Sequence, residues 1–459
     1  MQKDRINVKI LFVLSLGLLT GALNFGIASS ALPLFKSIFS VDERLITWIL
    51  SIFVLSYMIG ALFISKMSDR YGRKRIYILN MLILLIGTII VIFSNSYAMI
   101  IIGRIIQGFS AGGIFPMSSA IIGESFPVQK RGTALGVISA FFGFAFILGP
   151  FIGGLILQFG WQWLFIIDLP VILLIIVLGI QFLPKTKRTG LKSFDIPGIV
   201  LLGSSLALLA LGINQLDVNH LLNSIESYYI WPLFVSSAIL LVIWFINENK
   251  TKYPLITTKI FKSKQINLTI AIAILSGFIE IGAVFISSLA VVSLSFSNYI
   301  ASLMLITVLL AITIGSPLIG LLLDKLGSRT VLLISGACSS SGLLILSFFS
   351  GNFYLFVLAS TLVGFGFASV IGAPLRYIML NEIHESDRAT GQALINVSKS
   401  SGRLICSALF GAIIASKGYS IEGYNLAFLF IGIVAVIVII LSLGLKEKYE
   451  EHESLKNNY

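Results

Sequence analysis

The chain has 459 residues, of which 57% are hydrophobic and only 11% charged, and its mean hydropathy is +1.00. A soluble protein carries about twice that charged fraction, so most of this chain cannot face water. The formal net charge of +12 comes from basic residues that cluster in short loops, which sets orientation in a bilayer and does not indicate nucleic-acid binding. Cys338 and Cys406 lie in apolar stretches, and with only three histidines no metal site is expected.

Long apolar runs dominate the sequence, and a helix needs about 20 such residues to cross the hydrocarbon of a bilayer. The sequence therefore predicts an all-α polytopic membrane protein with fourteen spans. These cover residues 9–33, 45–65, 76–94, 98–124, 133–158, 163–183, 195–214, 228–246, 266–294, 299–322, 329–349, 353–378, 389–416 and 424–445. The first run is too long for a signal sequence, so we expect it to be retained as a span.

The basic residues give the predicted orientation of these spans. With the N-terminus in the cytoplasm, all but six of the 32 Lys and Arg residues fall on the inner side. The six exceptions are Lys36, Arg44 and Lys417, which fall outside, and Arg104, Lys399 and Arg403, which fall within spans. This asymmetry is the one that the positive-inside rule predicts. We expect a multi-pass protein of the cytoplasmic membrane with both chain ends in the cytoplasm.

One short charged loop occurs twice in the chain. Asp69-Arg70-Tyr71-Gly72-Arg73-Lys74 follows the second span, and Asp324-Lys325-Leu326-Gly327-Ser328-Arg329 follows the tenth. Because both loops have the same position within six spans, the sequence predicts two equivalent six-helix bundles, as in transporters with parallel repeats. We divide the chain into an N-terminal bundle (1–188), two additional transmembrane helices (189–250), a cytoplasmic linker (251–264), a C-terminal bundle (265–446) and a cytoplasmic tail (447–459).

Both loops are predicted to gate the inner side of the bundle. An acid at the end of one span can meet the positive end of a neighbouring helix dipole. The candidate gating residues are Asp69, Arg70, Gly72 and Arg73 in the first loop, and Asp324, Gly327 and Arg329 in the second. The alternative is that these residues only signal topology, make a turn and face lipid phosphates. The repetition of the full spacing favours the gate.

Arg104 lies within the fourth span, in the run Gly103 to Gly108. A cation inside a membrane costs about 2.5–3.5 kcal/mol on insertion scales, so we expect Arg104 to face the bundle interior and hold a polar partner. The alternative is that it extends towards the outer interface. Gln107, on the next turn of the helix, favours the interior position.

The fifth span is rich in small residues. Gly136, Gly149, Pro150, Gly153 and Gly154 recur along it, and Ala145 extends a four-residue spacing with two of them. Such a stripe allows another helix to pack closely, and Pro150 bends the helix because it frees a backbone carbonyl. The tenth span repeats the glycine–proline pattern around Pro317 and Gly320.

These patterns resemble the major facilitator superfamily, and within it the fourteen-span drug:proton antiporters, the branch of Tet(L)-like and Qac-type exporters. Residues 65–75 resemble motif A of that family, with Ser65 where glycine is usual. The run Arg104 to Gly108 resembles motif B, whose arginine is tied to proton coupling, and Gly136 to Gly154 resembles motif C, the antiporter signature. The resemblance covers almost the whole chain. It implies a facilitator core that alternates its access around a site near the membrane midplane.

The chain departs from that family at several positions. Asn24 stands where the branch carries a first-span acid, and Asp168 stands at the start of the sixth span, where asparagine is frequent. Arg403 occupies a place where tetracycline exporters carry an acid, and Lys399 lies on the same helical face. Because these two added cations oppose a cationic cargo, tetracycline is not expected as the substrate.

Glu280 is the one acid near the middle of a predicted span. Ionisable groups at this depth are usually kept for transport, and burial favours the protonated form of a carboxyl group. We therefore predict that Glu280 accepts the transported proton. The alternative is a structural ion network of Glu280 with Lys399 and Arg403. Asn24, Arg104, Lys399 and Arg403 complete the predicted proton-coupling and substrate set.

The expected function is secondary active transport, namely proton-coupled efflux of amphipathic drugs or related small molecules by alternating access. The runner-up keeps the fold and uses Lys399 and Arg403 to bind an anionic metabolite, lipid or siderophore. A third alternative, a non-transporting scaffold or sensor, is disfavoured because it would need a sizeable soluble module, which this sequence does not offer. Without a nucleotide-binding loop, a catalytic triad or metal-ligand spacing, we expect no enzyme activity and no cofactor. The expected partners are a small molecule, protons and the lipid bilayer, and we expect a monomer.

Overall fold

The computed structural model describes residues 7–41, 43–185, 195–217, 226–252, 254–256, 258–371 and 373–451. Within these ranges every regular element is a helix. Thirteen of the helices there are long and apolar enough to cross a membrane, and α5 is a further helix of 29 residues. A helix satisfies its own backbone hydrogen bonds, which explains why apolar runs of this length fold in this way in lipid.

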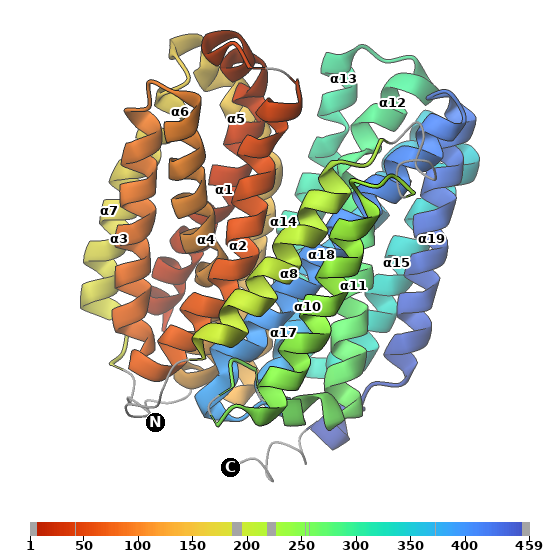
Figure 1. The fold of residues 1–459 in the computed structure, drawn as a ribbon. Coiled ribbons are helices and arrows are strands. Elements are labelled where there is room, and N and C mark those ends of the chain that lie inside the picture. The colour runs from red at the N-terminus through yellow and green to blue at the C-terminus, as the bar shows by residue number, and fades with distance from the viewer. Residues whose placement is uncertain are drawn as a thin grey trace.

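The first bundle forms the left side of the molecule in Figure 1. It contains α1 (Val8–Phe39), α2 (Glu43–Tyr71), α3 (Arg73–Ile92), α4 (Tyr97–Ser125), α5 (Val128–Ile156), η1 (Leu157–Phe159), α6 (Trp163–Ile166) and α7 (Asp168–Phe182). The closest packing within this bundle is between α2 and α4 and between α1 and α5. Ser96 caps α4 by accepting a hydrogen bond from the N–H of Met99, which fixes where that helix begins.

The second bundle forms the right side. It contains α11 (Lys264–Val284), α12 (Ile286–Leu294), α13 (Asn298–Leu303), α14 (Leu305–Leu326), α15 (Ser328–Phe349), α16 (Phe353–Ile371), α17 (Ala373–Glu382), η4 (Glu385–Asp387), α18 (Arg388–Ser416) and α19 (Ile421–Leu443). The sequence predicted one uninterrupted span for 266–294 and another for 299–322. In the structure the first is divided at Phe285 and the second at Met304.

Two additional helices lie between the bundles in the chain, α8 (Ile196–Asn214) and α10 (Trp231–Lys250), followed by η3 (Thr258–Lys262). They pack against each other, and the hydroxyls of Ser205 and Ser237 each donate to the backbone oxygen of the other residue at 2.8 Å. Figure 1 shows this pair crossing the front of the molecule, where α8 packs against α2 of the first bundle and α18 of the second. The predicted boundary at 188–189 and the tail residues 452–459 lie outside the described residues.

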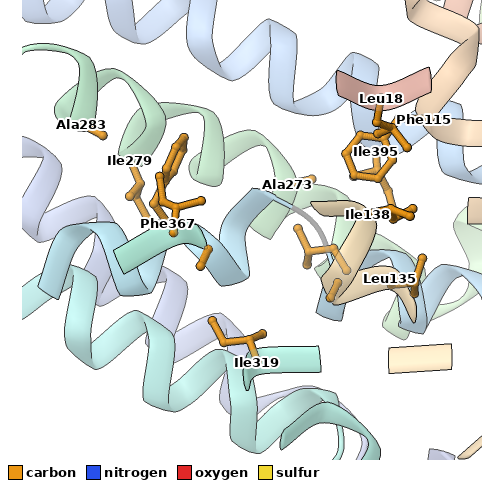
Figure 2. Packing of buried hydrophobic residues seen from close by; sticks show 14 of the residues in the cluster. Leu18, Phe115, Leu135, Ile138, Ala273, Ile279, Ala283, Ile319, Phe367 and Ile395 are labelled. Atoms are coloured by element: carbon orange, nitrogen blue, oxygen red, sulfur yellow. The ribbon is translucent and has the colours of Figure 1, made fainter. Parts of the chain in front are cut away.

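The two bundles meet along α5 with α14 and along α2 and α4 with α18. Glycines permit the first of these crossings, because a Cβ added to Gly136 would lie 2.5 Å from the backbone oxygen of Ser316, and one added to Gly320 would lie 2.6 Å from that of Gly132. One hydrophobic cluster extends across the interface. Figure 2 shows Leu135 and Ile138 from the first bundle together with Ile279, Ile319 and Phe367 from the second.

The repeated loop folds in the same way in both bundles. Gly72 is the single residue between α2 and α3, and Gly327 is the single residue between α14 and α15. Their φ angles are 95° and 83°, a left-handed region that favours glycine. The two loops lie at the end of the bundle where α1 begins and α19 ends, at the bottom of Figure 1. We call this the charged end and the opposite one the far end.

Candidate functional site

Asp69 joins the end of α2 to the start of α18. Its carboxylate accepts hydrogen bonds from the backbone N–H groups of Ala389 and Thr390, at 3.1 and 2.9 Å, and from the hydroxyl of Thr390 at 2.9 Å. Arg73 donates to the same carboxylate at 3.2 Å. The first turn of a helix has unsatisfied N–H groups and a partial positive charge, so Asp69 is held there by hydrogen bonds and by charge.

Asp324 makes a similar connection from α14 to the second turn of α5. It accepts from the N–H groups of Gly132 and Thr133, both at 2.8 Å, and from the hydroxyl of Thr133 at 2.6 Å. Its surroundings differ in one respect, since Ser328 stands where the first loop has Arg73. Ser328 donates through its N–H and its hydroxyl to Glu451 after the last span.

Both of these connections, which we call latches, cross from one bundle to the other. The helix that carries Asp69 belongs to the first bundle and α18 to the second, while Asp324 connects in the opposite direction. Ion pairs surround the latches, including Lys66 with Asp387 at 3.0 Å. The other gating candidates lie beside them: Arg73 also pairs with Glu124 at 3.1 Å, Arg329 pairs with Glu447 at 2.6 Å, and Arg70 lies 4.9 Å from the ring centroid of Tyr71. The charged end is therefore closed by contacts between the bundles.

Arg104 is fully buried within the first bundle. Its guanidinium donates to the backbone oxygens of Asn24 and Ile49, at 3.1 and 3.3 Å, and to the side chain of Gln107 at 3.0 Å. It also lies 4.1 Å from the ring centroid of Phe53, close enough for a cation–π contact. The structure thus places Arg104 in the interior, with polar partners instead of an acid in the part of the chain that it describes.

Asp168 extends this polar network to α7. Its carboxylate accepts a hydrogen bond of 2.8 Å from the side-chain N–H of Asn24, and it is only 2% exposed. By its place in the sequence, Asp168 lies at the start of the sixth predicted span, and it is not among the predicted site residues. The structure buries it and pairs it with Asn24, 144 residues away in the chain.

Glu280 binds both of the cations predicted near it. Lys399 lies 2.7 Å from one carboxylate oxygen, and Arg403 lies 3.3 Å from the other. Close packing of α11 on α18 produces this arrangement, because a Cβ added to Gly277 would lie 2.6 Å from the backbone nitrogen of Arg403. The network joins two helices of the second bundle, and all three side chains are at least three-quarters buried.

Arg376 is a site residue that the sequence analysis missed. It was counted with the inner-side basic residues, although it lies within the predicted span 353–378, two residues before its end. In the structure Arg376 is on α17 and only 1% exposed, so it faces the protein interior. Its guanidinium donates to the side-chain oxygens of Gln392 and Asn396 and lies 3.5 Å from the ring centroid of Phe115 on the opposite bundle. Pro374, two residues earlier, is the one sequence signal for an irregular helix here.

Tyr57 connects this region to the first bundle. Its hydroxyl accepts a hydrogen bond of 3.0 Å from Asn396, and it lies within electrostatic range of Arg376, Arg403 and Glu280. Lys399 is within the same range of these three charged side chains. Among the described residues, this region therefore holds three cations, Arg376, Lys399 and Arg403, and one anion, Glu280, which leaves two formal positive charges.

The glycine-rich helix α5 contacts a different partner at each end. Towards the charged end Gly136 packs on α14, and further along a Cβ added to Gly149 would lie 2.8 Å from the Cα of Gly26 on α1. Gly153 lies on the same helix. The side chain of Pro150 and the surroundings of Gly154 lie outside what the structure describes.

A cavity of about 300 Å³ lies where α8 meets the two bundles. Ser51 and Val54 of α2, Asn214 of α8, and Leu404 and Ser407 of α18 are among its lining residues. Asn214 donates to the hydroxyl of Ser51 at 2.8 Å. The additional helix pair therefore covers one side of the seam between the bundles.

Comparison with known proteins agrees with this architecture. The sequence matches the Major Facilitator Superfamily over residues 14–297 and 266–458. The chain belongs to this superfamily. It is thus a multi-pass membrane protein of a family of transporters rather than enzymes, with the all-helical major facilitator fold.

Several curated members of the superfamily are similar to this chain. The MFS-type transporter YfiU of Bacillus subtilis (strain 168) is 29% identical over 408 residues, covering 88% of this chain and 79% of that protein. The riboflavin transporter RibZ of Clostridioides difficile (strain 630) is 26% identical over 412 residues, with coverages of 89% and 88%. Multidrug resistance protein 3 of Bacillus subtilis (strain 168) is 28% identical over 409 residues, with coverages of 87% and 78%.

Solved structures share the fold at low sequence identity. The human organic anion transporter MFSD10 superposes with a TM-score of 0.69 at 16% identity, covering 96% of this chain and 100% of that one. The proton:xylose symporter XylE gives a TM-score of 0.68 at 16% identity, with 96% of each chain covered.

Proposed function

We propose that this member of the superfamily is a secondary active transporter that exports an amphipathic small molecule in exchange for protons. The observation that carries the proposal is the pair of similar latches, Asp69 on α18 and Asp324 on α5, which close one end of two repeated bundles. Releasing both latches would open the charged end, while the far end closes. Alternating access to a site between the bundles needs such a reversible contact.

The finer assignment follows the sequence analysis. We propose the fourteen-span drug:proton antiporter branch, with the charged end and both chain ends in the cytoplasm and the domain boundaries given above. Relatives named as multidrug resistance proteins support a drug cargo, and the riboflavin transporter supports a planar metabolite as an alternative.

The Glu280 network gives a physical basis for exchange. Glu280 binds Lys399 and Arg403 at 2.7 and 3.3 Å. Protonation of Glu280 would remove the charge that holds Lys399 and Arg403, whereas a cargo that needs Glu280 in its charged, paired form would exclude the proton. Mutually exclusive binding of two ligands is what antiport requires, since each bundle movement then carries one or the other.

A second candidate is an anionic cargo. It is favoured by the two positive charges that remain when Glu280 is set against Arg376, Lys399 and Arg403. Buried cations without acids need a counter-charge. An anionic group bound to Lys399 and Arg403 would release Glu280, which could then take up a proton. Cargo and proton would then bind together, so this candidate predicts the opposite sign of coupling.

Proteoliposomes with an imposed pH gradient test both candidates. The probes are ethidium as an amphipathic cation, carboxyfluorescein as an anion, and riboflavin. Antiport predicts that each substrate moves against the proton flow and that adding it releases protons. Arg403→Gln should reduce transport of the anion and leave that of the cation. If no probe moves in response to a pH gradient in either direction, the proposed coupling is wrong.

A further inference from the structure

Asp168 is a deeply buried acid of the described transmembrane region, as is Glu248 near the end of α10. Glu248, however, lies beside Asp195 and accepts a hydrogen bond from the N–H of Ile256, whereas Asp168 faces an amide. Asp168 is 2% exposed at the start of α7, and no cation forms an ion pair with it in the part of the chain that the structure describes. Glu280, by contrast, binds two cations, and Asp69 binds Arg73. A buried carboxylate without a counter-charge is costly, whereas the protonated form carries no charge.

The groups around Asp168 are neutral. Asn24 faces it from α1, and the other helices that pack against α7 in the described residues, α3 and α6, contribute no charged partner. The cation of this network, Arg104 on α4, donates to the backbone oxygen of Asn24 and not to Asp168. The link between Arg104 and Asp168 therefore passes through Asn24.

The side chain of Asn24 lacks one hydrogen-bond donor among the described residues. Both hydrogens of its amide are used, one on the backbone oxygen of Thr20 at 3.0 Å and one on Asp168 at 2.8 Å. Since both partners accept, the orientation of the amide is fixed. Its oxygen is buried and has no hydrogen-bond partner among the described residues. A carboxylate cannot supply the missing donor, whereas a protonated carboxyl group has one O–H to donate.

We infer that Asp168 binds a proton during the transport cycle, with Asn24 as the amide partner that can hold both its charged and its neutral form. The step is a simple association: a proton adds to a carboxylate oxygen of Asp168 on one side of the membrane and leaves from it on the other. The inference rests on the proposed proton-coupled transport. It assigns a proton site to the first bundle, separate from the charged network around Glu280.

The first test does not depend on any cargo. Infrared difference spectra of the purified protein between acidic and alkaline pH should contain the C=O stretch of a protonated carboxyl group, and Asp168→Asn should remove that band. Glu248→Gln is the matched control, because Glu248 is also 2% exposed and forms no ion pair among the described residues. It removes a different buried carboxyl group, so its spectrum should keep the band that Asp168→Asn loses. An unchanged band in Asp168→Asn would overturn the inference.

The second test uses the same vesicles and the ethidium probe. Asp168→Asn should lose export driven by a pH gradient but keep ethidium exchange at equal pH. The double variant Asn24→Asp with Asp168→Asn restores an acid–amide pair, so it should regain pH-driven export; it also decides the matter if the single variant does not fold. Retained pH-driven export in Asp168→Asn, or none in a folded double variant, contradicts the inference. If the unaltered protein shows no pH-driven export while the infrared band depends on Asp168, only the proposed function fails.

Discussion

Replacing Asp69 with Asn should open the charged end of the molecule. The substitution removes the negative charge and one of the two oxygens that accept from Ala389 and Thr390. A hydrogen bond to a charged group contributes about 1.5–3 kcal/mol, and a charge at a helix terminus up to about 2 kcal/mol. Because the side-chain oxygen of Asn still accepts a hydrogen bond, only part of this stabilisation is lost, and we expect the closed state to lose about 2–4 kcal/mol. Each 1.4 kcal/mol changes an equilibrium constant tenfold, so the ratio of closed to open molecules should fall roughly 30- to 1,000-fold.

The distance between the bundles at the charged end measures this change. Arg75 on α3 and Thr330 on α15 are exposed and lie next to the two loops, so each can carry a spin label. Cys338 and Cys406 are first replaced by alanine to remove the native thiols. Pulsed electron paramagnetic resonance should then record a second, longer distance in Asp69→Asn that is rare in the parent protein.

Two further variants make this experiment decisive. Asp324→Asn should shift the same distance because its latch uses the same set of donors, two backbone N–H groups and a threonine hydroxyl, whereas Glu422→Gln removes an exposed acid that is paired with Lys417 and should shift nothing. An unchanged distance distribution in both Asp69→Asn and Asp324→Asn would refute the latch mechanism, provided that both proteins elute as the parent does in size-exclusion chromatography.

Three other predictions follow from the contacts described. Glu280→Gln should abolish proton-coupled export while the protein still inserts; drug-driven proton release equal to that of the parent would disprove the role. Gly136→Val should hold α5 away from α14 and lower the melting temperature in detergent, whereas Gly351→Ala, where an added Cβ meets nothing within 4 Å, should change nothing. Burial raises the pKa of Glu451, so its contact with Ser328 favours the neutral acid. This contact is therefore strongest below the ordinary pKa of about 4.3, and it weakens as the pH rises through the raised pKa. Hydrogen exchange at the Ser328 amide, corrected for its intrinsic pH dependence, should accelerate accordingly.

Local features of the fold were predictable from the sequence because they depend on neighbouring residues. Apolar runs of sufficient length must form helices in lipid, and the two glycines at 72 and 327 adopt the turn that the repeated loop suggested. The acids at 69 and 324 were identified as candidates for the same reason. Their partners were not, because Thr390 is 321 residues from Asp69 and only the assembled bundles bring them together.

Residues whose importance depends on packing were missed or undervalued. Arg376 lies near the predicted end of a span, and nothing in the local sequence distinguishes a loop arginine from one stacked on Phe115 of the other bundle. Asp168 likewise lies at a helix start, where an acid is common. Its burial and its contact with Asn24 depend on how α1 packs against α7.

Each of the two latches costs roughly what one or two charges gain by crossing the membrane, so releasing both of them needs a further compensation. A membrane potential of 100 mV supplies about 2.3 kcal/mol for each charge that crosses, and each latch contributes about 2–4 kcal/mol by the same hydrogen-bond and dipole magnitudes. The carboxylates of Asp69 and Asp324 can be hydrated when the charged end opens, which lowers the cost of breaking them. An apolar seal of equal area would have no such compensation and would hold the bundles in one state. We therefore expect carboxylate-to-helix contacts, rather than a larger hydrophobic interface, wherever the two bundles must separate.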